Sequence, residues 1–339
     1  MSFVRDGGNA GGGVRLLGNV LALVSGFAVC TQVMADDYST RDDVVAFANE
    51  VSAAYGFEAA DLLTTFDRAV YKQSIIDAIS RPAEKRLTWG EYRQIFLNDA
   101  RIEAGKTFLH EHASTLGRAE SEFGVPAHVI VAVLGVETLY GRRKGSYRVL
   151  DALTTLGFNY PPRGKFFRKE LKEFLLLARE ENLEIDSLVG SYAGAMGYGQ
   201  FIPSSYRAYA IDFSGDGIKD IWNNPVDAIG SIAAYLSRHG WRRGEAITIR
   251  ATEPGDEELL NVSLKPYTTV EDVRKEGVKV AQDVASEASA TLMHLKGDDG
   301  SEYWLGLHNF YVITRYNHSR LYAMAVFQLG EAVAEDLRP

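Results

Sequence analysis

An apolar run that ends in a carboxylate constrains this chain more than any other feature. Residues 129–136 read VIVAVLGV, and Glu137 follows directly. Pro126 stands where proline can open a helix at its first turn, and apolar residues cover nearly every side, so we expect a buried helix. Glu137 would then be poorly solvated at the negative end of the helix dipole, and both effects predict a raised pKa. Such a carboxyl group is suited to act as a general acid near neutral pH.

A structural role for Glu137 is an equally good interpretation of this segment alone. Arg142, Arg143 and Arg148 follow along the chain. An ion pair with any of these arginines would also explain an acid at this position, because structural ion pairs perturb acids as active sites do. Other segments must decide between the two interpretations.

The N-terminal segment differs from the rest of the 339 residues. Arg5 and Arg15 precede the apolar stretch 16–29, and residues 33–35 offer small side chains for cleavage. We interpret residues 1–35 as a secretory signal peptide that is cleaved after Ala35. An uncleaved membrane anchor is the alternative, but the stretch is interrupted by polar residues and glycines and falls short of the roughly 20 apolar residues that a span needs.

The single cysteine, Cys30, lies inside this leader, so the mature chain would contain no disulfide. An exported protein without cysteines suits the bacterial periplasm, and a composition of 46% hydrophobic residues supports a core that needs no covalent staple. Lipidation of Cys30 is the alternative, but Val29 is bulkier than the residue expected before a lipidated cysteine. The formal net charge of −9 argues against nucleic acid as a partner.

Helical periodicity dominates the first half of the chain and returns at its end. We expect helices at 42–55, 58–69, 88–122 with breaks, and 166–181, in addition to the Glu137 helix. A further helix is expected at 320–337, with a packing face made of Leu321, Ala325, Phe327, Gln328, Leu329 and Val333.

The region from 245 to 316 has a different pattern. Short runs rich in β-branched residues at 246–249, 262–264 and 310–314 are separated by turn residues such as 296–300. This pattern predicts a small β subdomain, with a strand at 310–314 leading into the last helix. Asn317 or Ser319 would cap that helix.

Residues 190–206 alternate glycines with aromatic and polar side chains. Glycine lets a backbone approach a ligand closely, tyrosine and phenylalanine offer faces to sugar rings, and Ser191 and Gln200 offer hydrogen bonds. The composition fits a groove for a carbohydrate polymer. Taken alone, however, a plain glycine-rich loop that enters a helix at Pro203 is the simpler interpretation.

Residues 212–223 follow the spacing of a calcium-binding loop, with oxygen-bearing side chains at positions 1, 3, 5 and 9 and glycine at position 6. Asn223 replaces the usual bidentate glutamate at position 12, and Asp227 could supply the missing carboxylate. An Asx-rich turn without metal is the alternative. We favour a weak, structural calcium site whose ligands are Asp212, Ser214, Asp216, the backbone carbonyl of Ile218, Asp220 and Asp227.

A second catalytic acid is hard to nominate. Ordinary glycosidases use two carboxylates, about 5–5.5 Å apart for retention or about 6.5–9.5 Å apart for inversion. The aspartates of the acidic turn are committed there, and Asp151 is a lone candidate. One acid is enough where the substrate supplies its own nucleophile, as an N-acetyl group beside the anomeric carbon can, because one glutamate then acts first as acid and afterwards as base.

Six motifs in one order resemble the lytic murein transglycosylase B family, whose catalytic core is related to goose-type lysozyme. They include GVET at 135–138, GAMGYGQF at 194–201 and TRYNHS at 314–319, and the match runs from about Leu87 to the C-terminus. The other motifs lie at 150–161, 212–217 and 225–231. The resemblance implies a mainly α (α+β) fold, with a lysozyme-like catalytic core, an EF-hand-like calcium loop, a helical insertion and a small β subdomain.

On this basis we divide the chain into five parts. They are the signal peptide 1–35, an N-terminal helical segment 36–85, the lysozyme-like core 86–243 with its helical insertion around 146–189, the β subdomain 244–310, and a C-terminal segment 311–339 that returns to the core.

The resemblance also implies a reaction, the cleavage of the β-1,4 bond between N-acetylmuramic acid and N-acetylglucosamine in peptidoglycan. Glu137 matches the catalytic acid/base. It would protonate the leaving oxygen and then take the proton of the muramoyl C6 hydroxyl, which closes on the anomeric carbon to give a 1,6-anhydro product without consuming water. Positions that match the family's groove are Tyr92, Ser191, Gln200, Phe201, Tyr235, Tyr316 and Asn317, and Arg163 matches a peptide-contacting position.

Two alternatives to this reaction remain. A hydrolytic muramidase would use the same Glu137, and a non-catalytic glycan-binding scaffold would hold Glu137 as a structural residue. Peptidoglycan glycan strands are the expected partner in each case, and cell-wall synthesis enzymes are further candidates. The acidic net charge gives no attraction toward anionic peptidoglycan, so affinity must come from the groove.

Overall fold

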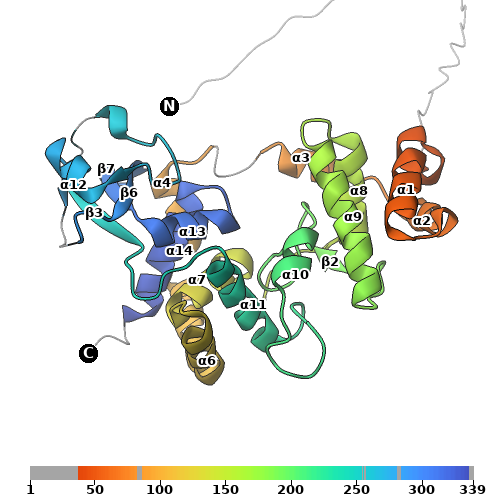
Figure 1. Cartoon of the computed structure of the whole chain (residues 1–339), viewed down its shortest axis with the longest axis horizontal. Helices are drawn as coiled ribbons and strands as arrows, with labels where there is room; N and C mark the ends of the chain where they lie inside the picture. The colour runs from red at the N-terminus through yellow and green to blue at the C-terminus, as the bar shows by residue number, and fades with distance from the viewer. Residues whose placement is uncertain (1–36, 82–85, 254, 256, 281–283, 336–339) are drawn as a thin grey trace, which may run out of the picture. The chain divides into compact units, whose positions relative to one another are not determined.

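The computed structural model describes residues 37–335 apart from 82–85, 254, 256 and 281–283. The predicted signal peptide and Cys30 lie outside the described residues. The first described elements are the N-terminal helices (Figure 1).

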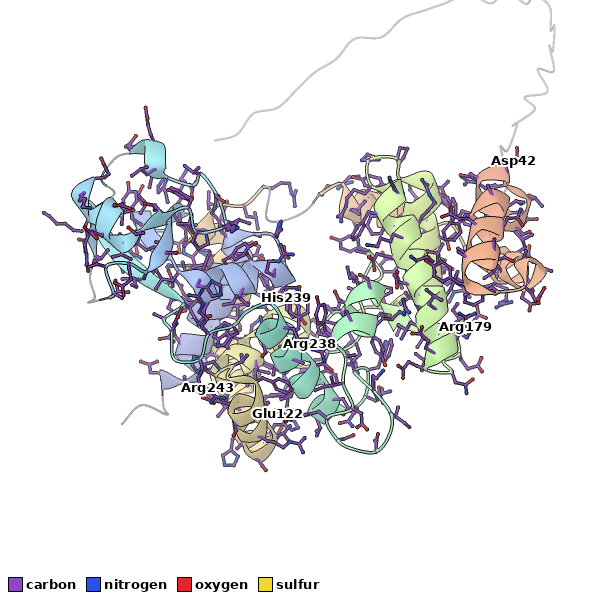
Figure 2. All side chains as sticks on the ribbon, viewed as in Figure 1. Asp42, Glu122, Arg179, Arg238, His239 and Arg243 are labelled. Atoms are coloured by element: carbon purple, nitrogen blue, oxygen red, sulfur yellow. The ribbon has the colours of Figure 1, made fainter. Side chains whose placement is uncertain are left out.

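The first two N-terminal helices follow the predicted boundaries closely, and the third, α3, has no predicted counterpart. A 3-10 turn η1 (Tyr38–Thr40) leads into α1 (Asp42–Tyr55), α2 (Ala59–Asp67) and α3 (Gln73–Ile79). Gly56 ends α1 in the left-handed conformation, with φ of 67°. In Figure 2, Arg179 is labelled on α9 (Gly164–Glu180), and it donates a hydrogen bond to the carbonyl oxygen of Tyr55 at 2.9 Å, which ties α1 to α9.

The predicted Glu137 helix is α7 (Ala127–Thr138), with Pro126 at the N-cap position. Residues 129–136 are all buried. The predicted helical stretch 88–122 forms α4 (Trp89–Phe96), α5 (Asp99–Glu111) and α6 (Ala113–Phe123). The helix α7 packs against α5, α6, α11 (Pro225–Arg238) and α14 (Arg320–Val333), which confirms that it is covered on nearly every side.

A two-residue antiparallel ladder marks the entrance to the next pair of helices. Strand β1 (Tyr147–Arg148) pairs with β2 (Val189–Gly190), and the chain between them forms α8 (Val149–Asn159) and α9, which pack against each other. The glycine-rich segment follows β2 and enters α10 (Pro203–Tyr209) at Pro203, as the sequence predicts. The helix α10 packs on α9.

The region after α11 contains a five-stranded antiparallel sheet in the order β4-β6-β7-β3-β5. It has its own hydrophobic cluster, in which Ile249, Leu292 and Leu305 are buried. Strands β6 and β7 form a hairpin that turns within the predicted segment 296–300. The elements of this region are β3 (Thr248–Glu253), η3 (Glu257–Leu259), β4 (Thr268–Thr269), α12 (Val270–Lys275), β5 (Lys279–Val280), β6 (Ser289–Gly297) and β7 (Gly300–Gly306).

Two predicted β segments are wrong. Residues 310–314 lie within α13 (His308–Tyr316), and 262–264 belong to no strand. In α13, Phe310, Ile313 and Thr314 are buried, a spacing that matches one helix face, so tertiary packing overrides the β propensity of the run. Val262 is 61% exposed, and its short run lies beside β6 without forming a ladder. The Asn261 amide donates to the Leu292 carbonyl oxygen, and the Thr291 hydroxyl donates to the Ser263 carbonyl oxygen.

The packing face predicted for the last helix is only partly right. Ala325, Leu329 and Val333 are buried, whereas Leu321, Phe327 and Gln328 are only half-buried. Tyr322, Ala323, Met324 and Val326 are buried instead. Ser319 caps the helix through its side chain, as one of the two predicted candidates.

No single helix among the described residues has the length and apolar composition to cross a membrane. The pair α6 and α7 meets those criteria only together, and it is bent by 112° between the two helices.

Figure 2 labels Glu122 near the end of α6 and Arg243 beyond α11. Arg243 donates a hydrogen bond to the carbonyl oxygen of Ser121, next to Glu122, at 2.6 Å.

Candidate active site

Glu137 lies in the last turn of α7 and is partly buried. The hydroxyl of Tyr322 on α14 donates a hydrogen bond to Glu137 Oε1 at 2.6 Å. A buried phenol needs a hydrogen-bond partner, and this carboxylate provides one. Burial and the nearby charge of Glu137 hold the pKa of Tyr322 well above its usual range. Tyr322 therefore stays a hydrogen-bond donor that fixes one oxygen of the carboxyl group.

Tyr316 lies beside this pair. Its ring stacks on that of Tyr322, with centroids 6.4 Å apart and an angle of 12° between the planes. Its hydroxyl donates to the carbonyl oxygen of Gly199 at 2.5 Å, which joins α13 to the glycine-rich segment. Burial and the charge of Glu137 raise the pKa of Tyr316 as well, so two protonated phenols lie near the carboxylate.

Three of the predicted substrate-binding residues pack on one another. The ring centroids of Phe201, Tyr235 and Tyr316 are 5.7, 5.8 and 4.7 Å apart in pairs. The Tyr235 hydroxyl donates to the carbonyl oxygen of Arg315 at 2.6 Å. Phe201 and Tyr235 are buried, so their rings mainly support that of Tyr316 and expose little surface to a ligand.

Ser191 and Gln200 shape the glycine-rich segment. The Ser191 hydroxyl oxygen accepts hydrogen bonds from the backbone amides of Ala193 and Ala195, at 3.2 and 3.1 Å. Gln200 has a left-handed backbone with φ of 49°, and its Nε2 donates to the carbonyl oxygens of Lys144 and Gly197 at 3.2 and 2.9 Å. Both side chains therefore hold the loop in shape.

Thr138 connects this loop to the end of α7. Its hydroxyl donates to the carbonyl oxygen of Tyr198 at 2.9 Å and accepts from the amide of Gly141 at 2.9 Å. A Cβ on Gly141 would lie 1.9 Å from the ring of Tyr198, so only glycine allows the ring to pack there. The residue after Glu137 is thus tied to the segment that carries Ser191 and Gln200.

A cavity of about 730 Å³ adjoins this site. Its wall includes Arg163 and Asn317 from the predicted residues, and Trp89, His294 and Lys296 from other parts of the chain. The wall also contains the link from Asn317 to Leu321, which joins Tyr316 to Tyr322, so the cavity lies next to the tyrosines that surround Glu137.

Tyr92, which the resemblance places in the groove, is buried and is not among the residues that line the cavity. Only 2% of it is exposed, and its ring packs against that of Phe96 with centroids 5.1 Å apart. It is also a lesser cause of the raised pKa of Tyr322, so the two phenols lie near each other.

Of the three arginines considered as ion-pair partners of Glu137, Arg148 is engaged elsewhere. Arg148 forms ion pairs with Asp151 at 2.6 Å and Asp186 at 3.4 Å. Asp151, the lone candidate for a second acid, also accepts the backbone amide of Val70 at 2.9 Å and is buried. The position of Asp151 is therefore structural.

Three carboxylates of the predicted calcium site come together. One oxygen atom from each of Asp212, Asp216 and Asp227 lies within 4.8 Å of the others. Asp227 is buried on α11 and accepts the amides of Phe213, Ser214 and Asp220 at 2.8–3.0 Å. An all-oxygen set of this kind fits a hard cation such as calcium.

The remaining predicted ligands are arranged as in an Asx-rich turn. Asp212 accepts backbone amides, that of Gly217 first, and these bonds lower its pKa. The Ser214 hydroxyl donates to Asp212 at 3.1 Å. One oxygen of Asp220 accepts the amides of Trp222 and Asn223, so this side chain caps the following turn, and Ile218 is 60% exposed. Both interpretations of the loop account for this geometry.

Tyr322 is the site residue that sequence reasoning missed. The predicted packing face of its helix left it out, although a tyrosine within an apolar helix signals a buried hydroxyl that must find a partner. Its partner lies 185 residues earlier in the chain, and only the fold brings the two together.

The chain is similar to known lytic transglycosylases in sequence and in structure. Residues 39–331 match the family model of the transglycosylase SLT domain. The chain is 40% identical over 310 residues to the membrane-bound lytic murein transglycosylase B of Escherichia coli, covering 89% of this chain and 85% of that protein. The chain therefore belongs to the lytic murein transglycosylase B family.

Solved structures agree with this assignment. The soluble lytic transglycosylase SltB1 of Pseudomonas aeruginosa, in its catenated form, has a TM-score of 0.84 at 52% identity, covering 88% of this chain and 99% of that one. The Escherichia coli lytic transglycosylase Slt35 in complex with calcium has a TM-score of 0.82 at 40% identity, covering 89% and 96%. These neighbours confirm the predicted mainly α (α+β), lysozyme-like fold.

Proposed function

We propose that this chain is a peptidoglycan lytic transglycosylase whose acid/base is Glu137. The observation that carries the proposal is the Glu137 carboxyl group at the end of a buried helix, held by the Tyr322 hydroxyl at 2.6 Å. The chain segment 317–321, which leads directly to Tyr322, lines a cavity large enough for sugar rings. Membership of the lytic murein transglycosylase B family supports the same reaction.

Glu137 acts twice in this reaction. The protonated carboxyl group first donates its proton to the oxygen of the β-1,4 bond, and the N-acetylglucosamine leaves with a free 4-hydroxyl. The resulting carboxylate then takes the proton from the muramoyl C6 hydroxyl, and O6 bonds to the anomeric carbon as the 1,6-anhydro ring closes. Glu137 ends protonated again, and no water enters the balance.

Tyr322 serves the second half of this cycle. A phenol that donates to Oε1 stabilises the carboxylate, which is the form that must accept the C6 proton. The same hydrogen bond leaves proton transfer to the other oxygen of the carboxyl group. Because the pKa of Tyr322 is raised, this tyrosine does not compete as an acid.

The groove residues divide into two roles in this proposal. Arg163 and Asn317, on the cavity wall, contact the glycan strand or its peptide directly. Ser191 and Gln200 hold the glycine-rich segment along the strand. Phe201, Tyr235 and Tyr316 form the aromatic floor that keeps the site in place, and Tyr92 packs separately on Phe96.

Location and calcium complete the proposal. The leader at 1–35 directs the protein to the periplasm, where its substrate lies. The cluster of Asp212, Asp216 and Asp227 binds calcium in a structural role, a proposal supported by the oxygen-only donor set. The ion would neutralise three carboxylates that stand close together and so hold the loop near α11.

Digestion of purified peptidoglycan sacculi tests the proposal. The protein and its Glu137→Gln variant are incubated with sacculi, and the released muropeptides are analysed by mass spectrometry. Products lighter than their hydrated counterparts by one water molecule, absent with the variant, support the transglycosylase. Hydrated products with reducing ends would instead indicate a muramidase, and binding without release by either protein would indicate a scaffold.

A further inference from the structure

The turn that follows Glu137 is strained. The helix α7 ends at Thr138, and Leu139, Tyr140 and Gly141 have φ values of 51°, 58° and 83°. Leucine and tyrosine rarely adopt this left-handed conformation because their Cβ atoms crowd the backbone. Such strain persists where the surrounding structure holds it, and it is concentrated at functional sites.

Tyr140 is one of the groups that hold this turn. Its ring is buried and stacks on that of Phe108, with centroids 5.7 Å apart. Its hydroxyl donates to the carbonyl oxygen of Arg101 on α5 at 3.0 Å. A Cβ on Gly105 would lie 2.4 Å from the phenol oxygen, and a Cβ on Gly135 would lie 2.7 Å from it. Glycine at both positions therefore makes room for the hydroxyl.

Arg101 is the second group. Only 8% of it is exposed, and its guanidinium lies over the ring of Phe96 at 5.1 Å. Its Nη1 donates to the carbonyl oxygen of Gly135, two residues before Glu137, and that oxygen also accepts the amide of Leu139 at 3.1 Å. A cation at this place interacts favourably with the C-terminal end of the helix dipole of α7.

We propose that Arg101 and Tyr140 are positioning residues for Glu137. Arg101 binds the carbonyl oxygen of Gly135, just before Glu137. Tyr140 lies in the strained turn just after Glu137 and binds the backbone of the same arginine. Together they fix the end of α7 so that Glu137 Oε1 meets the Tyr322 hydroxyl. The inference rests on the proposed catalytic role of Glu137, and it adds two residues that contact the backbone on either side of it.

The expected signature is a change in kcat with little change in KM. Arg101 and Tyr140 are both buried and spend their polar groups on backbone carbonyl oxygens, so we expect them to make no contact with the substrate. A displaced acid, in contrast, slows proton transfer steeply, because a misplacement of about 1 Å can cost about a hundredfold in rate.

Tyr140→Phe tests the proposal, because it removes the hydroxyl and keeps the ring. Tyr38→Phe is the matched control. Tyr38 is fully buried, and its hydroxyl donates to Asn159 Oδ1 at 2.8 Å near the N-terminal helices. Steady-state rates on soluble, uncross-linked peptidoglycan strands are measured together with thermal unfolding. We expect kcat of Tyr140→Phe to fall by tenfold or more at a KM within twofold, and Tyr38→Phe to lower only the melting temperature.

Arg101 variants provide the conservative rescue. Arg101→Lys retains a cation at the end of α7 but loses the planar guanidinium, so its kcat should lie between those of the wild type and Arg101→Met. A wild-type kcat in Tyr140→Phe, or equal losses of activity in Tyr140→Phe and Tyr38→Phe, would overturn the inference. Failure of the wild-type protein itself to release anhydro products would overturn the proposed function instead, and the two failures are therefore distinguishable.

Discussion

Two glutamates, Glu137 on α7 and Glu170 on α9, show how differently this fold treats a buried acid. Glu170 is only 2% exposed, and both of its carboxylate oxygens accept hydrogen bonds from Ser204, one from the backbone amide and one from the hydroxyl, each at 2.9 Å. Glu137 is less buried, and its Oε1 accepts from the phenol of Tyr322. The more deeply buried of the two is not the proposed acid.

The difference lies in what each carboxylate satisfies. Ser204 stands at the start of α10, where backbone amides lack partners within the helix, and Glu170 supplies one from another helix. Its task is complete within the fold. Glu137 instead accepts from Tyr322, a side chain that stays protonated and that directly follows the cavity-lining residues 317–321. Burial alone therefore does not single out the proposed acid, and its partner and location support the proposal.

Of the substitutions at these two glutamates and their partners, Glu137→Gln should have the largest effect on activity. Removing the proton carrier is expected to lower the rate of anhydro-muropeptide release about a thousandfold, within the usual range for general acid–base catalysis. The melting temperature should change little, because glutamine keeps an oxygen for the Tyr322 hydroxyl. Mass spectrometry of sacculus digests and thermal unfolding are the measurements, and comparable activity of the variant would assign the acid to another residue.

Tyr322→Phe should have the next largest effect. Loss of the hydroxyl removes the donor that holds Glu137 Oε1, and we expect kcat to fall by about ten- to a hundredfold while the ring still packs. Kinetics on soluble strands, with Tyr38→Phe as the control for losing a buried hydroxyl, measure it. Unchanged kcat would mean that the hydrogen bond has no part in aligning the acid.

Glu170→Gln should affect stability and its pH dependence more than catalysis. Burial raises the pKa of Glu170 above its usual value of 4.5, so the folded protein binds this proton more tightly than the unfolded chain. Stability from this group is therefore present at low pH and is lost as the pH rises from the unfolded pKa through the raised folded pKa. Urea unfolding at pH 4.5 and pH 7.5, values chosen to bracket this window, should show a smaller decline for the variant. An equal decline in both proteins would exclude Glu170 as the source.

The smallest expected effect concerns a third buried carboxylate, that of Asp227, and it depends on added calcium. Glu170 accepts one backbone amide, whereas Asp227 accepts three, and Asp212 and Asp216 lie beside it. Calcium at millimolar concentration should raise the melting temperature of the wild type by a few degrees, because a ligand that binds only the folded state stabilises it. Asp216→Asn should abolish most of that increase. The same increase in both proteins would place the ion elsewhere.

The sequence predicts those parts of the molecule in which local pattern and packing agree. The run before Glu137 is apolar on every side, and the helix it forms is buried on every side. Capping at Ser319 and the hairpin turn between β6 and β7 also follow from local chemistry. The position of the candidate acid was predictable for the same reason, since only one residue interrupts the pattern.

The rest depends on contacts between distant parts of the chain. Residues 322–326 are all buried, so α14 has no single apolar stripe from which to read its packing face, and the stripe that was predicted missed Tyr322. The run 310–314 is rich in β-branched residues, yet its neighbours demand a helix. The bond from Glu170 to Ser204 and the contact of Arg101 with Gly135 leave no periodic signal in the sequence.

The two-residue ladder between β1 and β2 has a consequence for how such a chain can diversify. Tyr147 pairs with Gly190 and Arg148 with Val189, so the chain enters and leaves the α8–α9 pair at the same point. A segment whose ends are already joined can lengthen, shorten or be exchanged for another without moving the strands that flank it. Gly145 and Gly190 meet so closely that a Cβ on Gly145 would lie 2.0 Å from the Gly190 carbonyl oxygen. A side chain at position 145 would therefore push the two ends of the α8–α9 segment apart.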